Sequence, residues 1–283
     1  MNNYKILDIL YVNSNGDKKV ESNILNPSEG YIPIGLCIAG TNFFGKNEPA
    51  RFMSLKYMSL ETPNIGSLFS EKIIYGNKDV CVNGEKQKVS KNGNEACFLK
   101  SISKPDWINP IGDICHDRHR TKICTFIKNN SVFKLNLRKL GNINKYVLTD
   151  IDGKNKTYNL VNSATEQLNW KTDNYLINIK EMGYTPAACS CWRYHTLGTQ
   201  QGDWYLGAAG EISMLAILKN EINNKLINIS SKYSNCISGL IDGFYWTSTE
   251  NHIYYTYRVS LGDGTVDFTT KNNGRYVIAL LQY

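Results

Sequence analysis

The chain has 283 residues, 42% of them hydrophobic and 20% charged, a composition ordinary for a globular protein able to bury one large or two moderate cores. Its net charge of +7 comes from 32 basic and 25 acidic residues spread along the sequence. Because no basic block alternates with aromatic residues, the composition argues against nucleic-acid binding. No apolar run approaches the ~20 residues that a membrane-spanning helix needs, so we expect no membrane insertion.

The first twelve residues carry an apolar run too short and too polar for a secretory signal. We therefore expect a protein that is made and folds in a cytoplasm, where thiols stay reduced. The 18 tyrosines suit either strand packing or a contact surface, and composition favours neither. The cysteines expected to be reduced are Cys37, Cys81, Cys97, Cys115, Cys124, Cys189, Cys191 and Cys236.

Residues 1–60 predict an N-terminal β-region. Residues 4–12 have the pattern of a strand, and the Asn- and Gly-containing residues 13–17 that follow form a strong turn signal. Two further strand-like runs cover residues 32–39 and 51–58. These elements indicate a small β-structure that precedes the rest of the chain.

Residues 61–148 contain turn-forming clusters and short apolar pieces without a sustained period. We expect a loop-rich intervening region there, with one helix near residues 121–130. A strand that runs into a turn over residues 147–154 marks the predicted boundary of a third region, residues 149–283.

The third region is predicted to contain two helices. The first covers residues 160–182 and ends at Gly183. The second follows residues 202–211, where a bulky β-type run leads through small residues to Glu211, a carboxylate suited to a helix N-terminus. The expected inner faces comprise Leu168, Tyr175, Ile179 and Met182 in the first helix, and Ile212, Leu215, Leu218 and Ile222 in the second.

After the second helix the chain is expected to contain only strands and turns. Asp263 and its two flanking glycines predict a hairpin turn, and Asn272-Asn273-Gly274 predicts another. The expected strands cover residues 244–249, 254–261, 265–270 and 275–282.

Several of these segments together carry a family resemblance. They are residues 150–157, Ala-Ala-Cys at 187–189, Gly-Asp-Trp-Tyr-Leu-Gly-Ala-Ala-Gly-Glu at 202–211, Tyr-Trp-Thr-Ser-Thr-Glu at 245–250, and the closing hairpins. The chain from residue 149 resembles bacterial and phage proteins that end in a C-type-lectin-like domain, grouped with the Fibrobacter-type major paralogous domain. Residues 33–37 and 51–56 further resemble virion proteins of crAss-like gut phages.

The resemblance implies an α+β, β-rich fold: an N-terminal β-region for virion attachment or oligomerisation, then a lectin-like domain with two helices flanking a twisted antiparallel sheet. Its usual Pro-Ser after the Trp-Tyr-Leu run is replaced here by Gly207-Ala208, so we expect a looser corner. We expect structural roles for Trp204, Tyr205, Leu206, Glu211, Trp246 and Glu250.

Phage members of this fold can carry diversified residues in their last strands, at codons that yield Asn, Tyr, Ser, Thr or Asp. The segment 249–276 is rich in these residues, which suit either a ligand-binding surface or ordinary hairpins. The candidate ligand-binding residues are Asn251, Tyr254, Tyr255, Tyr257, Asp267, Thr269, Asn272, Asn273 and Tyr276.

Catalytic and metal-binding patterns are weak. Cys115, His116, His119 and Cys124 lack the spacing of a zinc finger, so we expect separate histidines and thiols and no metal site. The calcium-ligand motifs of lectins are missing from the C-terminal half, and Asn47-Glu48-Pro49 lies in the wrong part of the chain. Ser101 and Lys104 match a short pattern that has no supporting partners. We expect no cofactor and no enzymatic activity.

Three cysteines leave an alternative open. Cys189 or Cys191 with Cys236 would suit a disulfide of the kind in animal lectins, although assembly in a cytoplasm favours thiols. Formylglycine-generating enzymes share the broader fold and act through cysteines. A distant alternative is therefore an oxidase of that type, which would need Cys189 or Cys191 to be accessible and reactive.

The favoured hypothesis is a structural virion protein, assembled in the host cytoplasm, that acts as a head fibre, capsid decoration or tail-associated protein. Its expected partners are other virion proteins, further copies in a homotrimer, and a host surface glycan or protein. The alternative is a bacterial cell-surface adhesin of the same fold.

Overall fold

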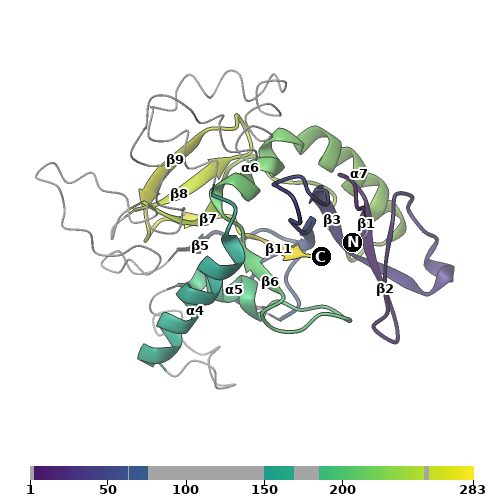
Figure 1. Cartoon of the computed structure of the whole chain (residues 1–283), viewed down its shortest axis with the longest axis horizontal. Coiled ribbons are helices and arrows are strands. Elements are labelled where there is room, and N and C mark those ends of the chain that lie inside the picture. The colour runs from purple at the N-terminus through teal and green to yellow at the C-terminus, as the bar shows by residue number, and fades with distance from the viewer. Residues whose placement is uncertain (1–2, 63, 76–149, 169–184, 252–254) are drawn as a thin grey trace, which may run out of the picture.

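The computed structural model describes residues 3–62, 64–75, 150–168, 185–251 and 255–283 (Figure 1). The fold is mixed α+β and rich in strands. Its largest element is a six-stranded sheet in the order β2-β1-β3-β4-β11-β6, in which all neighbouring strands are antiparallel. The strands are β1 (Ile9–Asn13), β2 (Lys18–Glu21), β3 (Tyr31–Ala39), β4 (Arg51–Tyr57), β6 (Trp204–Leu206) and β11 (Ile278–Gln282).

The three predicted N-terminal strands are confirmed as β1, β3 and β4, but β1 starts at Ile9 and not at the predicted residue 4. The turn after β1 forms because the Asn13 side-chain oxygen accepts the backbone N–H groups of Asn15 and Asp17, both at 2.9 Å, and Gly16 adopts φ +86°. This turn leads into β2, an edge strand that the sequence did not indicate. A short 3-10 helix, η1 (Pro27–Glu29), precedes β3.

The six-stranded sheet combines the first and last parts of the chain. Strand β4 pairs with β11, and the backbones of Ala50 and Tyr283 exchange two hydrogen bonds of 3.1 Å. Residues 1–60 and 149–283, which the sequence divides, therefore contribute neighbouring strands to one sheet. Most of the intervening region lies outside the described residues, and so does the helix expected near residues 121–130. Its described part supplies the short strand β5 (Ile73–Ile74).

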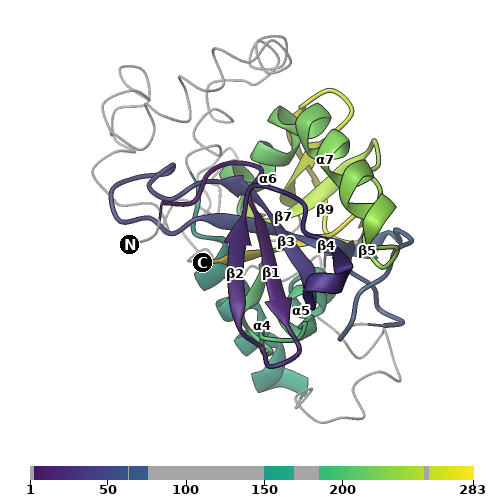
Figure 2. The same ribbon diagram turned by 90° about the vertical axis from the view of Figure 1, so that its right-hand side faces the viewer.

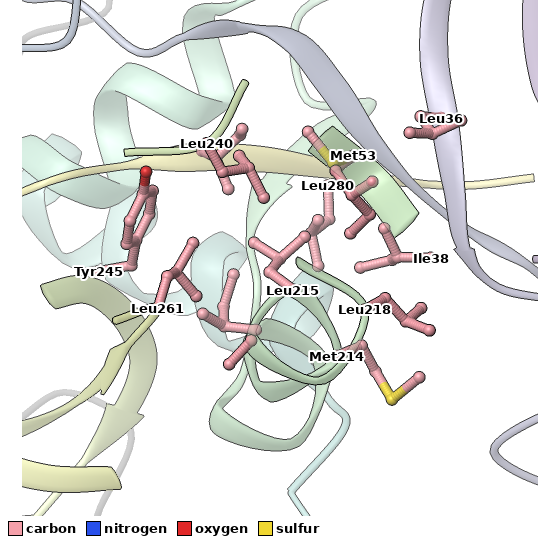
Figure 3. Packing of buried hydrophobic residues seen from close by; sticks show 14 of the residues in the cluster. Leu36, Ile38, Met53, Met214, Leu215, Leu218, Leu240, Tyr245, Leu261 and Leu280 are labelled. Carbon is pink, nitrogen blue, oxygen red and sulfur yellow. The ribbon is translucent and has the colours of Figure 1, made fainter. Parts of the chain in front are cut away.

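Helices cover both faces of this sheet, as Figures 1 and 2 show. Alternation along β6 sends Tyr205 into one core, and Trp204 and Leu206 into the other. The first core is closed by α6 (Ala209–Ile217) and α7 (Lys219–Lys232), and the second by α4 (Gly153–Leu168) and α5 (Pro186–Arg193). In Figure 3 the first core gathers Leu215 and Leu218 with Ile38, Met53 and Leu280 of the sheet.

The helices differ from the expected pair. Helix α4 starts at Gly153, ahead of the predicted start at residue 160, and residues 169–184 lie outside the described part of the chain. The predicted second helix is two helices separated at Leu218. Every residue of α6 is buried, because the large sheet lies on one side and a second sheet on the other, so the expectation of one apolar face was wrong. Helix α7 is amphipathic and buries Ile222, Leu226 and Ile229.

The second sheet is a meander of β7 (Phe244–Glu250), β8 (Tyr255–Ser260) and β9 (Val266–Thr270). The predicted turn between β8 and β9 is confirmed, with Gly264 at φ +70°. The expected single last strand is wrong. Its first residues form β10 (Gly274–Arg275), which pairs with β5, and the chain then crosses β7 at Tyr276 before it enters the large sheet as β11. The break occurs because the chain changes hydrogen-bonding partners at this point.

The corner between β6 and α6 is tightly packed. A Cβ atom on Gly207 would lie 2.6 Å from Leu280 Cδ1 and 2.9 Å from Ile212 Cδ1. The missing side chain lets these two core residues close over the backbone. The expectation of a looser corner was therefore wrong, because glycine here gives closer packing.

Candidate recognition surface

Glu211 is the centre of a buried junction at the corner between β6 and α6. Its carboxylate accepts hydrogen bonds from Arg51 Nε at 2.6 Å, from the Tyr205 hydroxyl and the Ala208 backbone at 2.9 Å each, and from the Gly153 backbone at 3.2 Å. The bond to Ala208 is the capping interaction that an acid three residues into a helix can make. Burial raises the pKa of Glu211, and the Arg51 guanidinium opposes that rise.

A second buried carboxylate lies beside the first. Asp150 accepts a 2.6 Å hydrogen bond from the Thr249 hydroxyl and pairs with Lys156, and Thr249 in turn accepts the Ala209 backbone N–H at 2.9 Å. The start of α4, the start of α6 and strand β7 therefore meet at one point. A buried charge is stable only when it has partners, and the junction supplies a partner for each of these charges. This is why the polar residues are tolerated in the core.

The six residues expected to be structural are all buried. Trp204, Tyr205 and Leu206 form the edge strand of the large sheet, and Trp246 donates its indole N–H to the carbonyl of Ile73 at 2.7 Å. Glu250 pairs with Lys271 at 2.6 Å, with both side chains 1% exposed. The Ser248 backbone donates to the Gly207 carbonyl at 2.8 Å and so joins the second sheet to the corner. The junction thereby holds the second sheet in place.

The candidate ligand-binding residues do not share one face of the second sheet. Tyr257 is fully buried against α6, and its hydroxyl accepts a 2.8 Å hydrogen bond from Asn251. Burial raises the pKa of its hydroxyl. A contact role for Tyr257 is therefore wrong, because alternation along β8 directs this side chain into the core. Tyr255 lies on the same side and packs edge-to-face on Phe268.

Other candidates hold the turn between β9 and β10. The Asn273 amide donates to the hydroxyls of Thr269 and Thr270 at 2.9 and 2.8 Å, while Asn272 is exposed. Tyr276 is half-buried beside Tyr245, and Tyr254 lies outside the described residues. Hydrogen bonding within the turn is therefore sufficient to explain why Asn273 and Thr269 occur at these positions.

The opposite, outer face of this sheet carries a charged cluster. We call Phe244, Arg258, Asp267 and Arg275 the outer-face cluster. Arg258 and Asp267 are register partners, and they form two hydrogen bonds of 2.5 and 3.0 Å. The Arg258 guanidinium lies 3.7 Å from the centroid of the Phe244 ring. The cluster places one predicted residue, Asp267, beside three aromatic or basic residues that the sequence analysis missed.

A signal for part of this cluster was present in the sequence. A tight turn around Asp263 sets the pairing of its two strands, and that register places Arg258 opposite Asp267. Arg275 carried no such signal, because it reaches the sheet only through the crossing of the chain at Tyr276.

Four of the described cysteines are buried, and the structure joins none of them in a disulfide: Cys37, Cys189, Cys191 and Cys236. Thiols in place of a disulfide are therefore confirmed for the last three. Burial raises the pKa of Cys191, and it raises that of Cys236 to about 12. These thiols do not meet the requirement of an accessible, reactive cysteine that the oxidase alternative makes.

Within the described ranges, no group of three or more His, Cys, Asp or Glu side chains is arranged to hold a metal ion. Cys115, His116, His119 and Cys124 lie outside those ranges, as do Ser101 and Lys104. The helices in the described part of the chain include none with the length and apolar character to cross a membrane.

Comparison with known proteins gives one structural similarity. No family model matches the sequence, and no curated protein matches it significantly. Among solved structures, a fimbrial protein from Bacteroides ovatus aligns with a TM-score of 0.46 and 16% sequence identity. The alignment covers 99% of this chain and 49% of that one, so the chain spans about half the length of the fimbrial protein. A similarity of this size assigns no function.

Proposed function

We propose that this chain is a structural protein of a phage virion, and that it presents a C-type-lectin-like domain to the host surface. The sequence resemblance over residues 149–283, together with residues 33–37 and 51–56, is the basis of the proposal. In the alternative, the same domain belongs to a bacterial cell-surface binding protein.

One structural observation carries the proposal. Three of the segments on which the resemblance rests, residues 150–157, 202–211 and 245–250, meet in the buried junction around Glu211 and Asp150. A motif made of contacting core residues constrains a fold more strongly than scattered matches do, because a change at one residue leaves its buried partner unsatisfied. The motif therefore supports the lectin-like assignment, while the surface of the domain must carry the binding specificity.

The arrangement of the sheets suggests how such a protein would be oriented. Strand β2 and the β7-β8-β9 sheet lie at opposite ends of the molecule in Figure 1. The N-terminal strands would contact other virion proteins, and the second sheet would face outward. We further propose that the protein assembles as a homotrimer, with a mass three times that of the 32.1 kDa chain.

Immunogold electron microscopy tests the location. Antibody raised against the purified protein should label intact phage particles recovered from a lysate of the cells that carry the gene. Label confined to the envelope of uninfected cells would instead support the adhesin. Light scattering on the purified protein checks the trimer, and a monomeric mass at micromolar concentration would contradict it.

A further inference from the structure

Two arginines lie against one aromatic ring on the outer face of the second sheet. The Arg258 guanidinium is 3.7 Å from the centroid of the Phe244 ring, and that of Arg275 is 5.9 Å from it. Arg275 is also 5.8 Å from the ring of Trp246. Arg258 lies on β8 and Arg275 on β10. The two arginines come together because the chain crosses β7 at Tyr276, the residue after Arg275.

The two guanidiniums differ in their partners. Arg258 is paired through two hydrogen bonds with Asp267. Arg275 donates one hydrogen bond of 2.6 Å to the adjacent Gly274 carbonyl, and its Nε is buried without a hydrogen-bond partner. No carboxylate among the described residues forms an ion pair with Arg275. The outer-face cluster therefore has two cations and one anion.

This imbalance is energetically unfavourable in the isolated chain. Burial, and then the charge of Arg258, lower the pKa of Arg275. A buried donor without an acceptor is destabilising, and more so when the donor is charged. An anion bound against the two guanidiniums would offset the repulsion between them.

We propose that the outer-face cluster binds the carboxylate of an acidic saccharide, with Arg275 as its principal ligand. A planar carboxylate matches the two-pronged donor geometry of a guanidinium, and the neighbouring Arg258–Asp267 pair already has this geometry. This inference rests on the proposed function, because it names the class of surface molecule that the second sheet would meet.

Calorimetric titration of the full chain with a hexamer of galacturonic acid tests the inference. A neutral galactose hexamer is the matched ligand. The wild-type protein should bind the acidic hexamer in preference, and binding should weaken as salt is added, because a charge pair is screened.

The Arg275→Gln variant removes the charge while keeping a polar side chain of related shape. It should weaken binding of the acidic hexamer by about tenfold or more, the size of a lost charge-assisted hydrogen bond. Lys46→Gln removes the same charge from an exposed residue on the β3–β4 connection, and it should leave affinity unchanged. Circular dichroism and thermal unfolding of each variant show whether the fold is retained.

Three outcomes would overturn the inference. The first is equal affinity of Arg275→Gln and wild type for the acidic hexamer. The second is no binding of that hexamer by the wild type, and the third is stronger binding of a sulfated or phosphorylated galactose oligomer. Host-cell binding that survives Arg275→Gln would reject the carboxylate site and leave the proposed function standing. Wild-type protein that binds neither cells nor any oligomer would count against both.

Discussion

Arg51–Glu211 and Arg258–Asp267 are arginine–carboxylate pairs in contrasting surroundings. In the junction, Arg51 and Glu211 have side chains that are 1% and 0% exposed, and Glu211 receives three further hydrogen bonds. In the outer-face cluster, Arg258 and Asp267 are 16% and 39% exposed. The same chemical pair is thus fixed in the core in one case and open to solvent in the other.

This difference separates a structural role from a recognition role. The buried carboxylate of Glu211 accepts hydrogen bonds from residues of the chain itself. An outside ligand therefore has no access to it. Arg51 is held equally firmly, because it also contacts Glu48 at 2.9 Å and the Pro49 carbonyl at 2.6 Å. The outer pair has a second arginine beside it and solvent on one side. Residue type alone therefore does not identify a binding residue.

Replacing Arg51 by Met should give the largest effect. The change leaves the carboxylate of Glu211 buried without its cation, and such a loss costs about 3–5 kcal/mol of unfolding free energy. Urea unfolding followed by circular dichroism measures it. The double variant Arg51→Met with Glu211→Leu should recover part of the loss, because it removes the unpaired charge. A single variant as stable as the wild type would contradict the structural role.

Tyr205→Phe should have the next largest effect. It removes a hydrogen bond to a charged group, worth about 1.5–3 kcal/mol near neutral pH. Burial, and then the charge of Glu211, raise the pKa of the Tyr205 hydroxyl above its usual value of 10. The unfolded chain therefore loses this proton first, so the stability of the wild type should fall as the pH rises above 10.

The phenylalanine variant lacks that ionisation, so its stability should fall less over the same range. Thermal unfolding of both proteins between neutral pH and pH ~11 checks the difference, since tyrosine in an unfolded chain titrates near pH 10. Parallel curves for the two proteins would show that Tyr205 is not the group responsible.

Thr249→Val should cost about 1–3 kcal/mol, because it removes the hydroxyl that donates to Asp150 and leaves the Ala209 N–H without its acceptor in the core. Thr249→Ser keeps the hydroxyl and is the matched control. Chemical denaturation of both variants makes the measurement. A loss in Thr249→Ser as large as that in Thr249→Val would contradict the hydrogen-bond role, because serine keeps the hydroxyl and lacks only the methyl group.

The outer-face pair should show the smallest effect on stability. In a double-mutant cycle of Arg258→Met and Asp267→Asn, the coupling free energy should lie within about 0–1 kcal/mol, as is usual for pairs near solvent. A coupling as large as that of the junction would mean that the outer-face cluster is also structural, and it would weaken the case for recognition there.

Local sequence patterns predicted most strands of the protein. The turn residues 13–17 and the turn around Asp263 are short-range signals, because a few side chains and glycines determine each conformation. The bulky run ending at Leu206 and the small residues after it likewise predicted a strand, a corner and a helix. The buried state of α6 could not be predicted from its own residues, because it depends on a second sheet that packs on it.

Local residue patterns were enough to place most strands and turns, to group the polar residues of one motif, and to put Glu211 in the first turn of a helix. Three features required the folded chain: the pairing of β4 with β11, the choice of Arg51 as the cation for Glu211, and the position of Arg275 beside Phe244. The partners in each case lie far apart along the chain. Arg51 and Glu211 are 160 residues apart, and a local pattern carries no information on which distant charge will satisfy a buried one.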